Sequence, residues 1–205
     1  HFKSLLAITQ YELLFTDIKH HYKEKSHAVL DWGAGNGWFS YYLLTAGFRR
    51  VTSYGYGWDD IRPALEKIRE LKVINGAECN LSNPSQLPFE NSSYNLVFSI
   101  GVLEHVHETG GDQLASLKEI NRILKSGGDF YCYHFPNKYT WIEFFKRIFI
   151  PASRRAYLHT RKFTRKQIEA YATKNGFQII KIKRYNFLPY NLFRENRFDN
   201  KSVSL

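Results

Sequence analysis

The sequence predicts an α/β fold in which a largely parallel sheet is wrapped by helices. Short apolar runs rich in β-branched and aromatic residues alternate along the chain with segments of helical periodicity. The first apolar run enters a glycine-rich turn that leads directly into a helical pattern, as in a strand–turn–helix unit. No internal repeat or low-complexity tract interrupts this alternation, so we expect a single domain over residues 1–205.

Six segments have the composition and length of strands, and five have the periodicity of helices. The clearest helix has Leu114, Leu117 and Ile120 at helical spacing, Asp112 as its N-cap and a Gly-Gly pair at 127–128 as its end. The last residues, 186–205, are weakly patterned, and a final strand there cannot be placed. The expected strands are 27–32, 51–58, 73–79, 94–100, 129–134 and 177–185, and the expected helices are 5–22, 39–46, 61–71, 113–125 and 165–175.

The composition describes a globular protein with an ordinary core. Hydrophobic residues make up 43% and aromatic residues 17% of the chain, which is enough to bury a core without disulfides or metals. The two cysteines, Cys79 and Cys132, lack the spacing of a zinc or redox site and fit a reducing cytoplasm as small buried residues. No apolar run approaches the roughly 20 residues needed to cross a bilayer, and no signal-peptide pattern is present.

The net charge of +10 is unevenly distributed. Residues 1–135 carry 13 Lys and Arg against 15 Asp and Glu, whereas residues 136–205 carry 16 against 4. The first part resembles a neutral enzyme core, and the second should attract anions such as phosphate groups, a membrane surface or nucleic acid. A solubilising surface is the alternative explanation.

The glycine-rich turn, residues 33–37, reads G-A-G-N-G and follows the buried run A-V-L-D-W. Gly33 and Gly35 permit a tight turn with the backbone close to a ligand, so the turn indicates a nucleotide-like ligand. The spacing is not G-x-G-x-x-G, and no G-K-[ST] follows, which disfavours a pyrophosphate cradle and a P-loop. Asp31 would repel a phosphate but suits a ligand with an ammonium or sulfonium charge.

These residues resemble the first motif of class I S-adenosylmethionine-dependent methyltransferases. Later segments are similar to that family in the same order: Q-L-P-F-E-N-S-S-Y-N-L-V at 86–97, I-G-V-L-E-H-V at 100–106 and E-I-N-R-I-L-K-S-G-G at 119–128. Residues 157–177 resemble the later helix and G-F strand of the ubiquinone-biosynthesis-like subgroup. Together the similar segments extend over about residues 27–185.

The resemblance implies a Rossmann-like, doubly wound, mostly parallel sheet of six to seven strands, with S-adenosylmethionine as cofactor. It implies methyl transfer to a small-molecule or a lipid- or nucleotide-linked acceptor, with oxygen as the expected atom. An RNA methyltransferase is the alternative that the basic second part favours, although no RNA-binding appendage is visible. A SAM-binding protein without catalysis is a second alternative, and the glycine spacing disfavours a nicotinamide-dependent enzyme.

The resemblance also implies the cofactor-binding residues. Asp31, Gly33, Ala34 and Gly35 map to the loop that binds the methionine end. The ribose carboxylate is Asp59 or Asp60, because the segment after the second strand is longer than in the family; Asp59 is preferred, and the other would be a helix N-cap. Beside the adenine we expect Asn80 and Leu81, with Ser82 or Asn83 as alternatives to Asn80. Trp58 either stacks on the adenine or belongs to the core. The fourth strand ends at the ligand-binding rim with Ser99, Ile100 and Gly101.

His105 is the candidate catalytic residue. A neutral imidazole after the fourth strand would take the proton of a hydroxyl acceptor as the methyl group moves. Positioning alone supplies much of the acceleration of an in-line methyl transfer, so the alternative is that His105 only orients or packs. His134 is a weaker second candidate, and no cluster of metal ligands stands out in the sequence.

An aromatic and basic insertion is expected at about 140–157, after the fifth strand. In this fold it would lie above the sheet edge that carries the reactive methyl, and it suits an acceptor with apolar and phosphate parts or contact with an anionic membrane. We therefore expect a cytoplasmic protein that is peripheral at a membrane if this contact exists. The alternative is a structural lid whose charges are solvated. Its aromatic and basic residues are Trp141, Phe144, Phe145, Lys146, Arg147, Phe149, Arg154 and Arg155.

Overall fold

The computed structural model describes residues 11–57, 59, 63, 75–80, 82–139 and 161–184. The chain divides into two compact units. The larger one comprises residues 24–136 and 161–178, and the smaller one comprises residues 1–23, 137–160 and 179–205.

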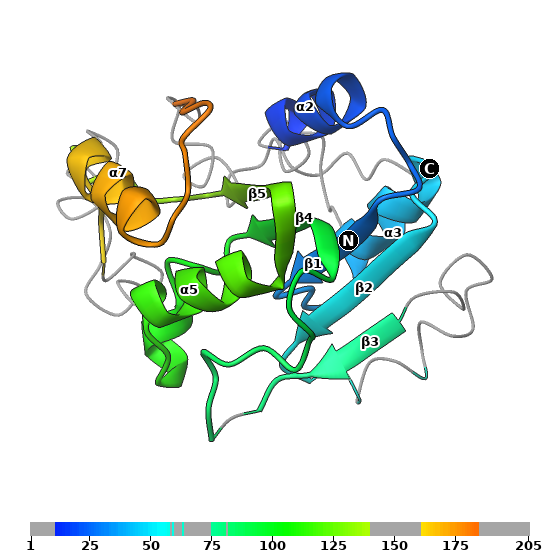
Figure 1. Ribbon diagram of the computed structural model, residues 1–205, viewed down its shortest axis with the longest axis horizontal. Coiled ribbons are helices and arrows are strands. Elements are labelled where there is room, and N and C mark those ends of the chain that lie inside the picture. The colour runs from blue at the N-terminus through cyan, green and yellow to red at the C-terminus, as the bar shows by residue number, and fades with distance from the viewer. Residues whose placement is uncertain are drawn as a thin grey trace, which may run out of the picture. The chain divides into compact units, whose positions relative to one another are not determined.

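The larger unit is built on a five-stranded sheet in the order β3-β2-β1-β4-β5, with every neighbouring pair parallel (Figure 1). Each residue of the central strand β1 is buried, as expected of a parallel strand with layers on both faces. The order reverses between β1 and β4, so the carboxyl ends of these two strands flank the position where open α/β sheets bind ligands. The strands are β1 (Ala28–Trp32), β2 (Arg50–Gly55), β3 (Asn75–Glu78), β4 (Tyr94–Ile100) and β5 (Leu124–Tyr133).

Three described helices of this unit pack on the sheet or on one another. Helix α3 (Trp38–Thr45) contacts β2, α5 (Gln113–Ile123) contacts β5, and α7 (Arg165–Lys174) contacts α5. Helix α5 begins where predicted, because the Asp112 carboxylate accepts the Ala115 N–H as an N-cap. It ends at Ile123 rather than at 125, and the Gly-Gly pair expected to end it lies within β5. Helix α7 begins with a capping box between Thr164 and Gln167. A short 3-10 helix, η2 (Val106–Thr109), was not predicted.

The core lies between the sheet and α5. Leu30 of β1, Val97 of β4 and Ile120 of α5 are fully buried members of one apolar cluster. Burying such a side chain stabilises the fold by about 1.5–3 kcal/mol, and this packing holds the carboxyl ends of the strands in place. On β4, Phe98 contacts Phe39 of α3 edge to face, with ring centres 5.3 Å apart.

The structure confirms the predicted parallel α/β architecture, with corrections to three strands. Strand β2 ends at Gly55 and does not continue through the predicted range to 58, because residues 56 and 57 form a turn. Strand β5 begins at Leu124 rather than at 129, because the segment between Leu124 and Asp129 forms an irregular pairing with β4 instead of a free turn. No strand occurs over residues 177–184, where Ile179, Ile180 and Ile182 are exposed. An apolar pattern favours a strand, but a strand also needs a neighbour to hydrogen-bond with. The sheet therefore has five described strands rather than six or seven.

Three other predicted segments lie almost wholly outside the described residues. These are the helix at 61–71, the insertion at 140–157 and the segment at 186–205. In the smaller unit, helix α2 (Glu12–His21) confirms the second half of the helix expected at 5–22. There Lys183 Nζ lies 2.5 Å from the buried Asp17 carboxylate of α2. In the described ranges, no helix is both long and apolar enough to cross a bilayer.

Candidate functional site

The glycine turn lies at the carboxyl end of β1 and leads into α3. Gly33, Gly35 and Gly37 have φ values of 79°, 52° and 75°, a region that disfavours other residues. A Cβ added to Gly33 would overlap the Val102 side chain, which follows β4, whereas a Cβ added to Gly35 would meet none of the described residues within 4 Å. The turn is therefore packed on one side and open above Gly35, which fits a ligand that approaches the backbone closely.

Asp31 is buried in β1, just before this turn. Its carboxylate accepts a 2.6 Å hydrogen bond from the Ser40 hydroxyl of α3, and the Ser40 and Ser53 oxygens lie 2.5 Å apart. Burial raises the pKa of Asp31 to about 7, although the Ser40 hydrogen bond acts in the opposite direction. Because Asp31 ties β1 to α3 and β2, the structure gives it a supporting role that the sequence did not indicate.

The segment after β2, where the ribose carboxylate was predicted, is held by a residue that the sequence analysis missed. The Glu78 carboxylate, at the end of β3, accepts the Gly57 N–H at 2.7 Å and the Asp59 N–H at 3.0 Å. Asp59 itself is exposed. An acidic residue at the carboxyl end of a strand adjacent to β2 was the available signal. Trp58 and Asp60 lie outside the described residues.

The predicted adenine-side and rim residues differ in exposure. Asn80 is exposed, and its Oδ1 accepts the Ser82 N–H at 2.9 Å in a local turn. Leu81 lies outside the described residues. At the end of β4, Ile100 and Gly101 are partly exposed, but Ser99 is fully buried and accepts the Leu103 N–H. Ser99 thus shapes the turn after β4 from within the core.

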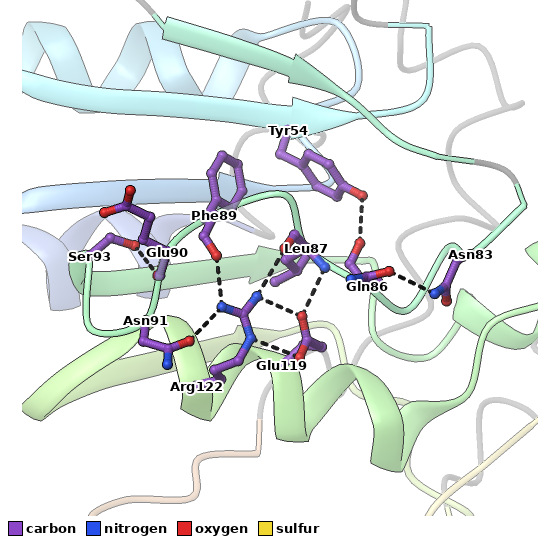
Figure 2. Close-up of polar contacts among 10 residues, drawn as sticks. All are labelled: Tyr54, Asn83, Gln86, Leu87, Phe89, Glu90, Asn91, Ser93, Glu119 and Arg122. Carbon is purple, nitrogen blue, oxygen red and sulfur yellow. Dashed lines mark hydrogen bonds and ion pairs between the residues drawn. The ribbon is translucent and has the colours of Figure 1, made fainter.

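The segment before β4 is clamped by α5 (Figure 2). Arg122 donates to the carbonyl oxygens of Leu87 and Phe89 and to Asn91 Oδ1, at 2.7–2.9 Å. Its remaining two N–H groups bind the Glu119 carboxylate, which also accepts the Leu87 N–H. The sequence motifs at 86–97 and 119–128 are therefore two halves of one hydrogen-bonded unit.

The turn after β4 brings together the predicted His105 and a buried carboxyl. His105 Nδ1 lies 2.8 Å from Glu108 Oε1, and the His105 side chain is 40% exposed. Glu104 is 2% exposed, with Oε1 3.9 Å from His105 Nε2. Burial, together with the negative charge of Glu108, raises the pKa of Glu104 to about 8. The sequence analysis did not select Glu104 as a site residue.

His134 follows β5 with a φ of 70°, which is rare for a residue with a side chain. Such strain persists where surrounding contacts impose it, often at functional sites. Both cysteines are free thiols; Cys79 is buried as predicted, whereas Cys132 is only partly buried. In the described part of the chain no group of His, Cys, Asp or Glu is arranged to hold a metal ion.

Residues 30–132 match the model of a family described as "Methyltransferase domain". Over 121 residues the chain is 35% identical to an uncharacterised protein of Methanocaldococcus jannaschii, covering 57% of this chain and 46% of that protein. Over 109 residues it is 30% identical to the sarcosine/dimethylglycine N-methyltransferase of Aphanothece halophytica, covering 50% and 35%. The chain thus matches less than half the length of both relatives.

The fold also occurs in solved structures. The YcgJ protein of Bacillus subtilis superimposes with a TM-score of 0.60 at 17% identity, covering 82% of this chain and 67% of that one. At this identity the likeness concerns the fold alone. It agrees with the parallel sheet and flanking helices described above.

Proposed function

Since the chain belongs to the methyltransferase-domain family, we propose that it transfers a methyl group from S-adenosylmethionine to a hydroxyl group of its acceptor. S-adenosylmethionine is the cofactor that follows from this family. The acceptor that we propose is a small molecule or a lipid- or nucleotide-linked one. The observation that carries the proposal is the left-handed glycine turn after buried β1, which is open above Gly35.

The residues around the turn fit this cofactor. Gly33, Ala34 and Gly35 would bind its methionine end, and the buried Asp31 behind them favours a positively charged ligand over a phosphate. The segment that Glu78 holds would bind the ribose through Asp59 or Asp60. A carboxylate suits that position because it accepts hydrogen bonds from two hydroxyls at once.

When bound, S-adenosylmethionine supplies a methyl group on a positively charged sulfur. The task of the chain is then to align an acceptor oxygen with that methyl group, since positioning provides much of the acceleration. The turn after β4 is suited to this task, because Val102 contacts Gly33 and the following residues include Glu104 and His105. His105, held by Glu108, is the orienting or proton-accepting group that the sequence analysis proposed.

The acceptor proposal is supported by charge. Residues 136–205 carry 16 Lys and Arg against 4 Asp and Glu, which favours an acceptor with phosphate groups or contact with an anionic membrane. The two free thiols fit the reducing cytoplasm as the setting. The substitutions Arg154→Glu and Arg155→Glu test the acceptor proposal, because they should reduce anionic-vesicle binding while leaving the affinity for S-adenosylmethionine unchanged.

Calorimetry tests the cofactor directly. We expect S-adenosylmethionine and S-adenosylhomocysteine to bind the full chain, and NADH not to bind. Binding of NADH alone would contradict the proposal. A short RNA added to the cofactor-loaded protein tests the alternative of an RNA methyltransferase, which requires binding that weakens strongly as salt is raised.

A further inference from the structure

Glu104 is a buried charged residue that the proposed function has not yet used. Its side chain is 1% exposed, and neither carboxyl oxygen has a hydrogen-bond partner among the described residues. Burying a polar group without a partner destabilises a protein, and burying a charged group without one destabilises it more. A bound molecule would supply the hydrogen bond that a carboxyl group in such a position lacks.

The position of Glu104 connects it to the glycine turn. Val102, two residues before it, contacts Gly33, so the turn after β4 lies directly against the loop at the end of β1. The Gly101 N–H donates to the Tyr133 carbonyl at 3.0 Å, which joins this turn to the end of β5. A Cβ added to Gly101 would lie 3.8 Å from Glu104 Oε1 and 4.0 Å from His134 Cδ2. The carboxyl therefore lies at the carboxyl ends of β4 and β5, beside the proposed cofactor loop.

We propose that the Glu104 carboxylate accepts the proton of the acceptor hydroxyl during methyl transfer. As the acceptor oxygen bonds to the methyl carbon, its O–H bond breaks and the proton passes to Glu104. The bond between carbon and sulfur breaks at the same time, and its electron pair stays on sulfur. This inference rests on the proposed function and narrows it, because it assigns the proton to Glu104 rather than to His105.

Among the described residues, four other groups near Glu104 titrate or carry charge. His105 and Glu108 lie on the same stretch of chain, Cys132 lies on β5 and His134 follows β5. The pKa of Cys132 is raised by burial and by the Glu104 charge, so it remains a thiol at neutral pH. Glu104, whose raised pKa is close to neutral pH, is matched to the work of a general base.

The test compares two ligands that differ in charge at the reacting sulfur. S-adenosylmethionine carries a sulfonium charge there and S-adenosylhomocysteine does not, while their amino-acid parts are identical. A carboxylate near the reacting methyl group lies close to that charge, and an opposite charge nearby shifts a pKa by about one unit or more. The affinity of S-adenosylmethionine relative to S-adenosylhomocysteine should therefore rise about tenfold from about pH 6 to about pH 9. Ionisation of Asp31 affects both ligands alike and cancels in the ratio.

Calorimetry on two variants tests whether Glu104 causes this pH dependence of the affinity ratio. Glu104→Gln should remove the rise with pH, whereas Glu108→Gln, which removes a charge from the same stretch, should retain it. In wild type near pH 8, S-adenosylmethionine binding should release about half a proton more than S-adenosylhomocysteine binding does, measured in two buffers of different ionisation enthalpy. This wild-type measurement decides the matter even if Glu104→Gln fails to fold.

A ratio that does not change with pH, or a rise that persists in Glu104→Gln, would overturn the assignment of Glu104. Binding of neither ligand at any pH would instead contradict the proposed function. The two failures are therefore distinguishable.

Discussion

The Arg122 guanidinium donates a hydrogen bond to the Leu87 carbonyl oxygen at 2.9 Å. Glu119, which pairs with Arg122, accepts the Leu87 N–H at 3.1 Å, so both backbone polar groups of Leu87 are bound by this pair. All the N–H donors of Arg122 are used in this unit (Figure 2). The hydrogen bonds between Arg122 and Glu119 are the main reason that the pKa of Arg122 is raised and the pKa of Glu119 is lowered. The unit fastens the segment before β4 to α5.

Arg122→Lys should therefore destabilise the protein by about 2–4 kcal/mol. A lysine keeps the positive charge but lacks the fork that reaches the Leu87 and Phe89 carbonyls together, and hydrogen bonds to charged groups contribute about 1.5–3 kcal/mol each. The measurement is chemical unfolding. The matched control is Arg165→Lys, because Arg165 makes an equally short bond to Glu169 on an exposed helix face and should contribute less than about 0.5 kcal/mol. Equal losses of unfolding free energy in both variants would show that the hydrogen bonds of Arg122 contribute no more than an exposed ion pair does.

Gly33→Ala and Gly35→Ala should separate packing from ligand binding. Both positions have positive φ, so each substitution has a similar backbone strain of about 1 kcal/mol. Only at Gly33 would the new methyl group overlap Val102, so Gly33→Ala should lower the free energy of unfolding by more than Gly35→Ala does. Thermal unfolding without ligand provides this comparison.

Gly35→Val tests the open side of the same turn. A branched side chain there should abolish binding of S-adenosylmethionine and S-adenosylhomocysteine while the protein still folds, because none of the described residues would lie within 4 Å of the new Cβ. Circular dichroism checks the fold and calorimetry measures the binding. Unchanged affinity would show that the ligand does not lie above Gly35.

Local sequence patterns predicted most strands of the sheet, but they did not predict the residues that hold the candidate site in place. Strand β4 has the predicted bounds and β1 differs by one residue, because buried parallel strands read as continuous apolar runs. The start of β5 was missed, since its irregular pairing with β4 depends on the neighbouring strand and not on the residues of β5 alone. Glu78 and Glu104 were missed for a related reason: their roles come from groups distant in sequence, Gly57 for one and the end of β5 for the other.

Glu78→Gln should weaken S-adenosylmethionine binding about tenfold. The amide keeps one oxygen acceptor but presents an NH2 group to one of the two backbone N–H groups, so the segment that carries Asp59 loses a bond of about 1.5–3 kcal/mol to a charged group. Calorimetry measures the affinity, and Glu90→Gln is the control because Glu90 is exposed. If Glu78→Gln binds as wild type does, the hold on this segment is not needed for the cofactor.

Asp59→Ala should lower the affinity for S-adenosylmethionine at least tenfold, because a carboxylate that binds the ribose makes charged hydrogen bonds of about 1.5–3 kcal/mol. Asp60→Ala should have a much smaller effect. The reverse order would show that Asp60 is the ribose ligand and that the alignment of this segment with the family is shifted by one residue.

Glu104 should make the stability of the ligand-free protein fall as pH rises. Its folded-state pKa of about 8 is above the ordinary value of 4.5, so the folded state holds a proton that the unfolded state releases between these values. Stability is therefore greatest below about pH 4.5 as far as this group is concerned, and it declines until the folded-state pKa is passed, by a total on the order of 5 kcal/mol. Glu104→Gln cannot ionise and should lack this decline.

Asp31, whose pKa is also raised, contributes its own decline to both proteins, so the difference between wild type and Glu104→Gln isolates Glu104. Urea unfolding at about pH 5 and about pH 9 measures it: the variant should gain stability relative to wild type at the higher pH, and a constant difference would show that Glu104 is ionised throughout.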